Sequence, residues 1–239
     1  MTTATSDPRP APARDVLDEV FDAVLFDMDG TLISSTRSVE RCWLRLADEF
    51  GMPTDDLSPF RYHGVPARDI LDLLLADRDA AERASALARV VELEVSDTEG
   101  IEVLPGAVEA LAALGAVGGA AGRAAVVTSC GSRLAAARIA AVALPAPATV
   151  VTADDVERGK PDPEPYRAGA ARLGVDVRRC LVVEDAESGI RSGRAAGAAV
   201  LAVRTTEAEG PGGGADLVVD DLSKVRFEVT GAGVRVRRA

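Results

Sequence analysis

The segment FDAVLFDMDGTL, residues 21–32, decides how this chain can fold. Its first half, FDAVLF, is a short apolar run, and the polar turn DMDGTL follows it directly. A short apolar run bounded by a glycine-containing turn is typical of a buried strand. The segment therefore predicts a strand whose carboxyl end carries the two carboxyl groups of Asp27 and Asp29.

Further along the chain, short apolar runs alternate with helical patterns. The runs are AAVVTS at 124–129, ATVVT at 148–152, CLVVED at 180–185, AAVLAV at 198–203 and ADLVV at 215–219. Strands separated by helices indicate parallel pairing, because parallel neighbours need a crossover connection. The runs are continuously apolar, as expected for strands covered on both faces. We therefore predict an α/β fold with a doubly wound parallel sheet, a Rossmann-like core.

The region after the first strand has a different character. Residues 39–96 carry apolar side chains at helical spacing and show no strand pattern, which predicts an all-helical domain inserted into the core. The predicted organisation is a disordered tail at 1–15, an α/β catalytic core at 16–36 and 104–226, a helical cap at 37–103, and a C-terminal extension at 227–239. The sequence leaves open whether that extension adds an edge strand or frays.

The composition of the chain argues against several classes of partner and site. The 239 residues carry a formal net charge of −11, so nucleic acids and anionic membranes are poor partners. No run approaches the roughly 20 apolar residues of a membrane span, and residues 1–15 lack the apolar region of a signal peptide. Cys42, Cys130 and Cys180 form no metal-binding or disulfide pattern. We expect a cytoplasmic protein, monomeric by default.

Polar side chains close the predicted strands. They are Asp27 and Asp29 after the first strand, Thr128 and Ser129 after the second, Lys160 beyond the third, and Glu184 and Asp185 ending the fourth. Ligands of doubly wound sheets bind at the carboxyl ends of strands, so we expect these side chains to converge. Carboxylates gathered there would repel each other unless a divalent cation lay between them. Oxygen ligands favour Mg²⁺.

These residue types suffice for phosphoryl transfer. Asp27 can attack phosphorus and form an aspartyl-phosphate, and Asp29 can protonate the leaving oxygen and then activate water. The metal and Lys160 can neutralise the transferring group, while Thr128 and Ser129 can hold its oxygens. Apart from Lys224, every other basic residue is arginine, so the retained Lys160 indicates a role for a compact ammonium.

Four motifs in this order resemble those of the haloacid dehalogenase (HAD) superfamily, in the branch with a small helical C1-type cap. They are DMDGTL at 27–32, VVTS at 126–129, RGKPDPEPY at 158–166 and VVEDAESGI at 182–190. The similarity runs from about residue 22 to 221. It implies an Mg²⁺-dependent phosphatase of the sugar-phosphatase or β-phosphoglucomutase-like branch, acting on a small phosphorylated metabolite such as a sugar or polyol phosphate.

The resemblance also implies roles for single residues. Asp27 would be the nucleophile and a metal ligand, and Asp29 the acid/base, with its backbone carbonyl also at the metal. Asp185 would complete the metal shell with Glu184 beside it. Thr128 and Lys160 would bind the phosphate, as would Ser129, which follows Thr128.

The cap offers weaker candidates. The segment HGVPARDIL at 63–71 resembles a loop that closes over the core site, which makes His63 and Arg68 candidates for substrate contact. Ser34, Ser35 and Arg37 lie at the expected hinge, where they either line the entrance or end the turn.

Two alternatives stay open. A sugar phosphomutase resembling β-phosphoglucomutase would share the core residues, but its cap histidine and arginine positions hold Val39 and Ala67 here, with Arg68 displaced by one. A phospho-accepting binding module without turnover would need neither Asp29 nor a cap that excludes water. Asp29 also argues against dehalogenation, because dehalogenating members lack it. Hydrolysis is the favoured prediction.

Overall fold

Six parallel strands form the central sheet of the computed structural model, which describes residues 14–53, 65–115, 122–206 and 210–239. Their order is β5-β4-β1-β6-β7-β8. The bounds are Ala23–Phe26 for β1, Ala124–Val127 for β4, Val150–Val151 for β5, Cys180–Glu184 for β6, Ala199–Val203 for β7 and Leu217–Val219 for β8. The predicted α/β class with a parallel sheet is confirmed, and β1 lies in its interior between β4 and β6.

Both faces of the sheet are covered, which explains the continuous apolar runs. Successive side chains of a strand point to opposite faces. Val24 and Phe26 of β1 pack in one core cluster with α4 (Ala107–Ala113) and α5 (Ser132–Ala141), whereas Leu25 packs in a second cluster with α6 (Glu164–Arg172) and α7 (Glu187–Ala196). Short 3₁₀ helices at Ala153–Asp155, Val177–Arg179 and Leu222–Lys224 connect the other elements.

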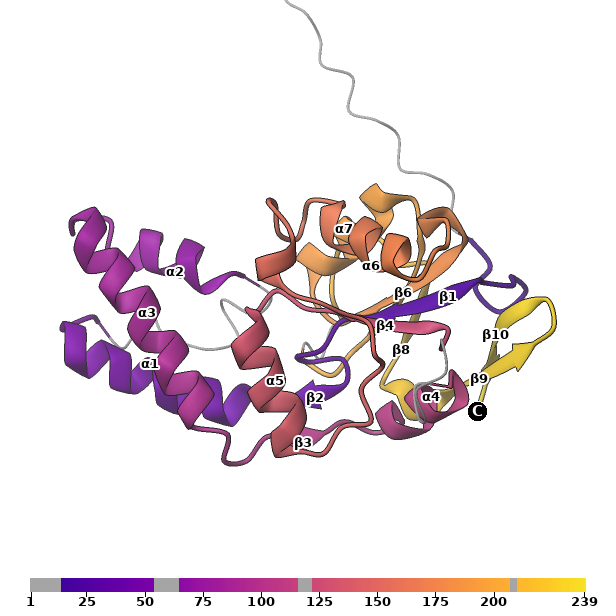
Figure 1. The fold of residues 1–239 in the computed structure, drawn as a ribbon, viewed down its shortest axis with the longest axis horizontal. Helices are drawn as coiled ribbons and strands as arrows, with labels where there is room; N and C mark the ends of the chain where they lie inside the picture. The colour runs from indigo at the N-terminus through magenta and orange to yellow at the C-terminus, as the bar shows by residue number, and fades with distance from the viewer. Residues whose placement is uncertain (1–13, 54–64, 116–121, 207–209) are drawn as a thin grey trace, which may run out of the picture.

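Three helices stand apart from the sheet in Figure 1 and form the cap. They are α1 (Thr36–Phe50), α2 (Ala67–Leu74) and α3 (Ala80–Ser96), and they share a small apolar core that includes Trp43, Leu46 and Val90. The Asp79 carboxylate caps α3 by accepting a 2.8 Å hydrogen bond from the Glu82 amide. These described helices lie within the predicted cap range of 37–103, apart from the first residue of α1.

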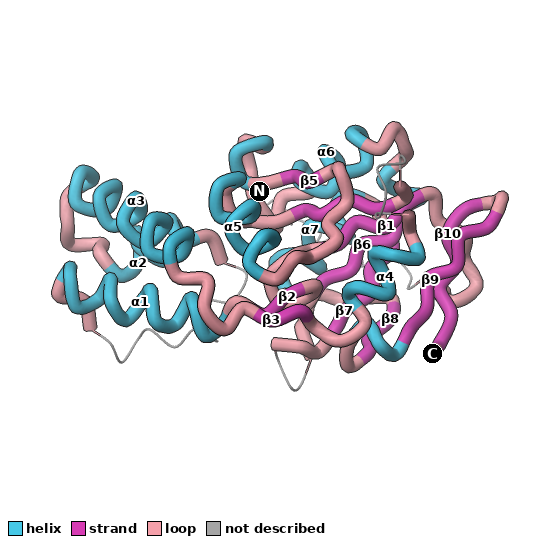
Figure 2. The backbone as a smooth tube through the Cα atoms, turned by 60° about the horizontal axis from the view of Figure 1, so that its bottom comes forward, coloured by secondary structure: helices cyan, strands magenta, loops and turns pink. Residues whose placement is uncertain are grey.

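Two short strands connect the cap to the core. The chain enters the cap through β2 (Ile33–Ser34) and leaves it through β3 (Glu102–Val103), and the two strands pair antiparallel. Figure 2 shows this pair between the cap helices and the sheet. None of the helices in the described ranges is long and apolar enough to cross a bilayer.

The C-terminal segment forms an antiparallel hairpin of β9 (Val225–Thr230) and β10 (Gly233–Arg238). It does not extend the six-stranded sheet; instead it packs beside α4 on the α4–α5 side of the core. The ring of Phe227 meets that of Phe26 edge-on, with centroids 5.8 Å apart. The hairpin begins two residues before the predicted extension at 227–239, so that predicted boundary falls inside β9.

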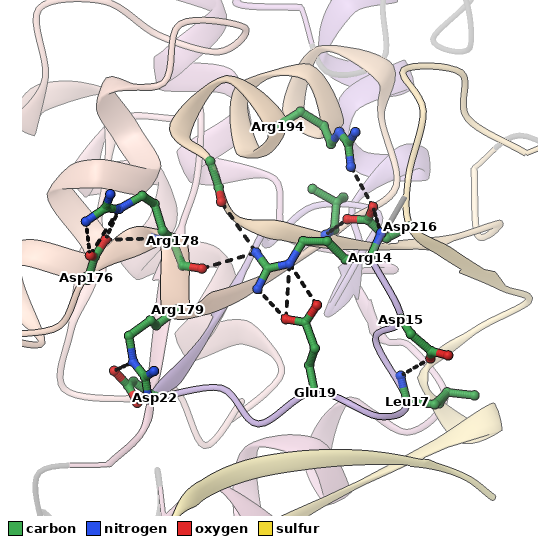
Figure 3. Close-up of polar contacts among 12 residues, drawn as sticks. Arg14, Asp15, Leu17, Glu19, Asp22, Asp176, Arg178, Arg179, Arg194 and Asp216 are labelled. Atoms are coloured by element: carbon green, nitrogen blue, oxygen red, sulfur yellow. Dashed lines mark hydrogen bonds and ion pairs between the residues drawn. The ribbon is translucent and has the colours of Figure 1, made fainter. Parts of the chain in front are cut away.

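The first described residue, Arg14, contacts the residue just before β8. The Arg14 backbone amide donates a 2.9 Å hydrogen bond to Asp216, and its guanidinium pairs with Glu19. Figure 3 shows this guanidinium between Glu19 and backbone carbonyls, with Arg194 reaching the same Asp216. The chain is therefore tied down immediately before β1.

Candidate active site

Asp27 lies directly after β1 and is buried, with 7% of its surface exposed. Its backbone amide continues the parallel ladder by donating to the Val183 carbonyl at 2.9 Å. The chain then turns sharply, because the Met28 carbonyl accepts hydrogen bonds from the following amides and Gly30 adopts a φ of 90°. This turn holds the Asp27 carboxylate at the carboxyl edge of the sheet and places Asp29 within reach of the hinge residue Ser35.

Lys160 supplies the positive charge of the site. Its Nζ lies 2.6 Å from Asp27 Oδ1 and 2.7 Å from Glu184 Oε1, and it donates to the Val127 carbonyl at 2.9 Å. Burial alone would lower the pKa of Lys160, but the two carboxylates outweigh it and the pKa lies above its ordinary value. Lys160 is therefore a permanent cation beside Asp27.

Glu184 has both carboxylate oxygens engaged by protein donors. Oε1 accepts from Lys160 and from the Tyr166 hydroxyl at 2.7 Å. Oε2 accepts from the backbone amides of Asp185 and Ala186 at 3.0 and 3.2 Å. This arrangement makes Glu184 a holder of Lys160. Tyr166 was not predicted, although it ends the RGKPDPEPY motif.

Asp185 is oriented by two hydroxyl groups. Thr31 donates to Oδ1 at 3.0 Å and Thr206 donates to Oδ2 at 2.8 Å. Thr31 belongs to the DMDGTL motif, whereas Thr206 lies beyond β7 in a segment with no motif to indicate it. The Asp185 residue is almost completely buried, and these two donors fix the orientation of its carboxylate.

The site carries more negative than positive charge. Oxygens of Asp27, Glu184 and Asp185 lie within 4.8 Å of one another, with Lys160 as the neighbouring cation. Burial raises the pKa of Asp27 well above its ordinary value, and the two other carboxylates raise it further against the opposing effect of Lys160. A hard divalent cation would relieve this repulsion, and the buried oxygen donors fit one.

The phosphate-binding candidates lie on the neighbouring strand. Thr128 follows β4, and its amide donates to the Val151 carbonyl at 2.9 Å. Thr128 is buried and Ser129 is half-buried. Since β4 pairs with β1, the ends of both strands meet at the same edge of the sheet. The structure thus gathers Asp27, Thr128, Lys160, Glu184 and Asp185 from four separate segments, as predicted.

Comparison with known proteins agrees with this geometry. The family model of haloacid dehalogenase-like hydrolases matches residues 21–197. The chain belongs to this family. It is 39% identical to hexitol phosphatase A of Escherichia coli over 84% of this chain and 91% of that protein. Validoxylamine A 7'-phosphate phosphatase of Streptomyces hygroscopicus is 32% identical, with 87% and 97% covered.

Solved structures of hydrolases share the fold of this chain. A hydrolase from Pseudomonas syringae superposes with a TM-score of 0.70 at 26% identity, covering 84% of this chain and 94% of that one. The predicted HAD-superfamily membership is therefore confirmed.

In this HAD hydrolase, the Asp29 carboxylate is bound at the hinge and by a core helix. Its Oδ1 accepts a 2.7 Å hydrogen bond from Ser35, and its Oδ2 pairs with Arg138 at 2.9 Å. Arg138 also pairs with Glu94 of the cap at 2.8 Å. Neither Arg138 nor Glu94 was predicted, because a single charged residue within a helical pattern is ordinarily a solvated one.

The two cap candidates have different outcomes. Arg68 is exposed at the start of α2 and lines a cavity of about 600 Å³ between α2 and α3, together with Arg133 of α5. Neither Asp27 nor Lys160 lines that cavity, so substrate contact by Arg68 stays a prediction. His63 lies outside the described residues.

Proposed function

We propose that this HAD hydrolase is a Mg²⁺-dependent phosphatase that hydrolyses a small phosphate monoester, in particular a sugar or polyol phosphate. One observation carries the proposal: the buried Asp27 carboxylate lies 2.6 Å from Lys160 Nζ and within 4.8 Å of an Asp185 oxygen. A nucleophile, a fixed cation and a second metal-binding carboxylate thus meet at one point. The substrate class is supported by relatives named hexitol phosphatase A and validoxylamine A 7'-phosphate phosphatase.

The metal would be held by side-chain oxygens of Asp27 and Asp185, with the Asp29 backbone carbonyl as a third protein ligand. Glu184 would hold Lys160 in place, since its oxygens already accept four hydrogen bonds. When bound, Mg²⁺ would neutralise charge on the phosphoryl oxygens and on Asp27, so that the two anions can approach.

The reaction proceeds in two displacements. A carboxylate oxygen of Asp27 attacks phosphorus, the bond from phosphorus to the ester oxygen breaks, and Asp29 gives its proton to that oxygen, which leaves as an alcohol. Asp29 then takes a proton from water, which attacks the aspartyl-phosphate. The bond from phosphorus to Asp27 breaks, inorganic phosphate forms, and both aspartates return to their starting states.

Thr128, Ser129 and Lys160 would hold the phosphoryl oxygens during both steps. Lys160 is suited to this because its ammonium is buried, permanently charged and oriented by three acceptors. The cap would exclude bulk water and select the leaving group. A mutase remains the alternative within the family, and the side chains of Val39 and Ala67 cannot supply the polar contacts that the mutase cap makes.

The test is phosphate release from a panel of sugar, polyol and glycerol phosphates, using enzyme stripped with EDTA and then supplied with Mg²⁺. We expect turnover only with the metal, and a loss of at least about 10³-fold in Asp27→Asn, which lacks the nucleophile. Asp176→Asn, on an exposed turn, is the matched control. Equal rates for Asp27→Asn and wild type would overturn the proposal, and a new sugar isomer seen by NMR in place of phosphate would establish the mutase.

A further inference from the structure

One buried arginine joins the cap to the catalytic core. Arg138 lies on α5 and is only 4% exposed, although its neighbours along the helix are mostly alanines. Its Nη1 lies 2.9 Å from Asp29 Oδ2 and its Nη2 lies 2.8 Å from Glu94 Oε2. Its Nε is the one buried side-chain nitrogen or oxygen within the described ranges that has no hydrogen-bond partner.

The cap holds its side of this contact in place. Glu94, on α3, is 8% exposed, and its second oxygen accepts a 3.1 Å hydrogen bond from the indole nitrogen of Trp43 on α1. Two cap helices therefore position the carboxylate that Arg138 meets. The contact belongs to the packing of α3 against α5, which is the main helix contact between cap and core within the described residues.

On the core side, Arg138 contacts Asp29, the proposed acid/base. One Asp29 oxygen accepts from Ser35, at the hinge where the chain enters α1, and the other faces Arg138. One oxygen is thus bound at the hinge, and the other by a core arginine that also pairs with Glu94 of the cap. An unbroken series of polar contacts runs from Trp43 through Glu94 and Arg138 to Asp29.

Stability alone does not explain such an arrangement, because a buried ion pair contributes little more than apolar residues of similar volume would. Arginine differs from apolar residues in geometry: its planar, rigid fork can orient two carboxylates at once. Opening of the cap would move Glu94 away from Arg138 and leave Arg138 paired with Asp29 alone. The geometry is therefore suited to coupling cap position with the orientation of Asp29.

We propose that Arg138 is a positioning residue that orients the Asp29 carboxylate and does so fully only when Glu94 of the closed cap pairs with it. The inference rests on the proposed role of Asp29 as the proton donor to the leaving group. It predicts a defect that depends on the leaving group. An alkoxide needs that proton in order to leave, whereas the acetate of acetyl phosphate leaves without it.

The experiment compares kcat/KM for a hexitol phosphate and for acetyl phosphate at saturating Mg²⁺. Arg138→Met should lose about 10²-fold or more on the hexitol phosphate, the scale of general acid catalysis, and less than about 10-fold on acetyl phosphate. Arg138→Lys should recover part of the loss, because an ammonium can reach one carboxylate but cannot bridge both. Glu94→Gln should show the same leaving-group dependence with a smaller loss.

The matched control is Arg89→Met, which removes an ion pair to Glu49 between the same two cap helices; the side-chain partners of Arg89 in the described ranges, Glu49 and Glu92, both lie in the cap. It should leave both rates within about twofold, as surface ion pairs contribute little. Trp43 is the single tryptophan of the chain, so its fluorescence reports whether Glu94 keeps its place. We expect that emission to change in Arg138→Met and to stay unchanged in Arg89→Met.

Equal losses of Arg138→Met on the two substrates would overturn the inference. Should the methionine variant fail to fold, losses in Arg138→Lys and in Glu94→Gln that are the same for both substrates would overturn it. Both results differ from failure of the proposed function. In that case the wild-type protein would release phosphate from neither substrate, and the variants could not be compared.

Discussion

At the scale of single residues, the site depends on small side chains as much as on charged ones. Glu184 can hold Lys160 only because Gly189, at the start of α7, leaves room for its carboxylate. A Cβ added at Gly189 would lie 1.6 Å from Glu184 Oε1 and 2.0 Å from Glu184 Cδ. A glycine in a helix ordinarily costs up to about 1 kcal/mol of stability relative to alanine. At this position the missing side chain makes space for a buried carboxylate.

Gly189→Ala should therefore lower the activity of the enzyme although helix propensity improves. The added methyl group must displace Glu184 and with it Lys160, so we expect kcat to fall about 10²-fold, the scale of losing one transition-state contact. Steady-state kinetics would measure this, with the far-UV circular dichroism unchanged. Gly231→Ala is the matched control, since an added Cβ there has nothing within 4 Å. Similar activity of both variants would contradict the role given to Glu184.

At the scale of elements, the C-terminal hairpin completes the core on one side of the sheet. Val234 and Val236 of β10 are fully buried, and Phe227 of β9 is only 6% exposed. The backbone of Val234 exchanges two hydrogen bonds with Phe21, at 2.7 and 2.8 Å, just before β1. The hairpin thus stabilises the start of the strand that leads to Asp27, the proposed nucleophile.

Phe227→Ala should destabilise the protein by about 3 kcal/mol, because it leaves a cavity beside Phe26. Urea denaturation would measure the change in the free energy of unfolding. Val229→Ala, on the same strand but 49% exposed, should cost less than about 0.5 kcal/mol. If Phe227→Ala were no worse than Val229→Ala, the hairpin would not belong to the folding core.

At the scale of the whole molecule, an acidic chain is covered by arginine–carboxylate pairs. Arg89, Arg172 and Arg178 lower the pKa of Glu49, Asp155 and Asp176, respectively, to about 2, chiefly through direct hydrogen bonds. Each pair is partly exposed to solvent, so each alone contributes little. Together they make acid stability a property of the entire surface.

The free energy of unfolding should therefore decrease as the pH falls from about 4.5 to about 2. The pKa values of these carboxyl groups are lower in the folded state than in the unfolded state, so the unfolded state binds more protons in this window. Burial raises the pKa values of Asp27 and Glu94 in the folded state. These two groups therefore affect the free energy of unfolding only at higher pH, above the ordinary carboxyl range. Urea denaturation between pH 5 and pH 3 measures the slope, which should be shallower in Glu49→Gln. A slope that is flat, or of opposite sign, would contradict this account.

The amino-acid sequence by itself determined the fold class and most of the site. Both depend on local signals: apolar runs with polar ends predicted the strands, and because parallel strands end at one edge, Asp27, Thr128, Lys160 and Asp185 had to converge. The helical spacing of residues 39–96 likewise predicted the cap insertion.

Only the tertiary structure decided the remaining contacts. Arg138 and Glu94 are 44 residues apart, and nothing local distinguishes either one from a solvated charge. Thr206 and Tyr166 reach their carboxylates through loop and helix packing, and the hairpin's position depends on which face of the sheet was left to cover. Such contacts join distant segments through packing and burial, which leave no periodic signal in the chain.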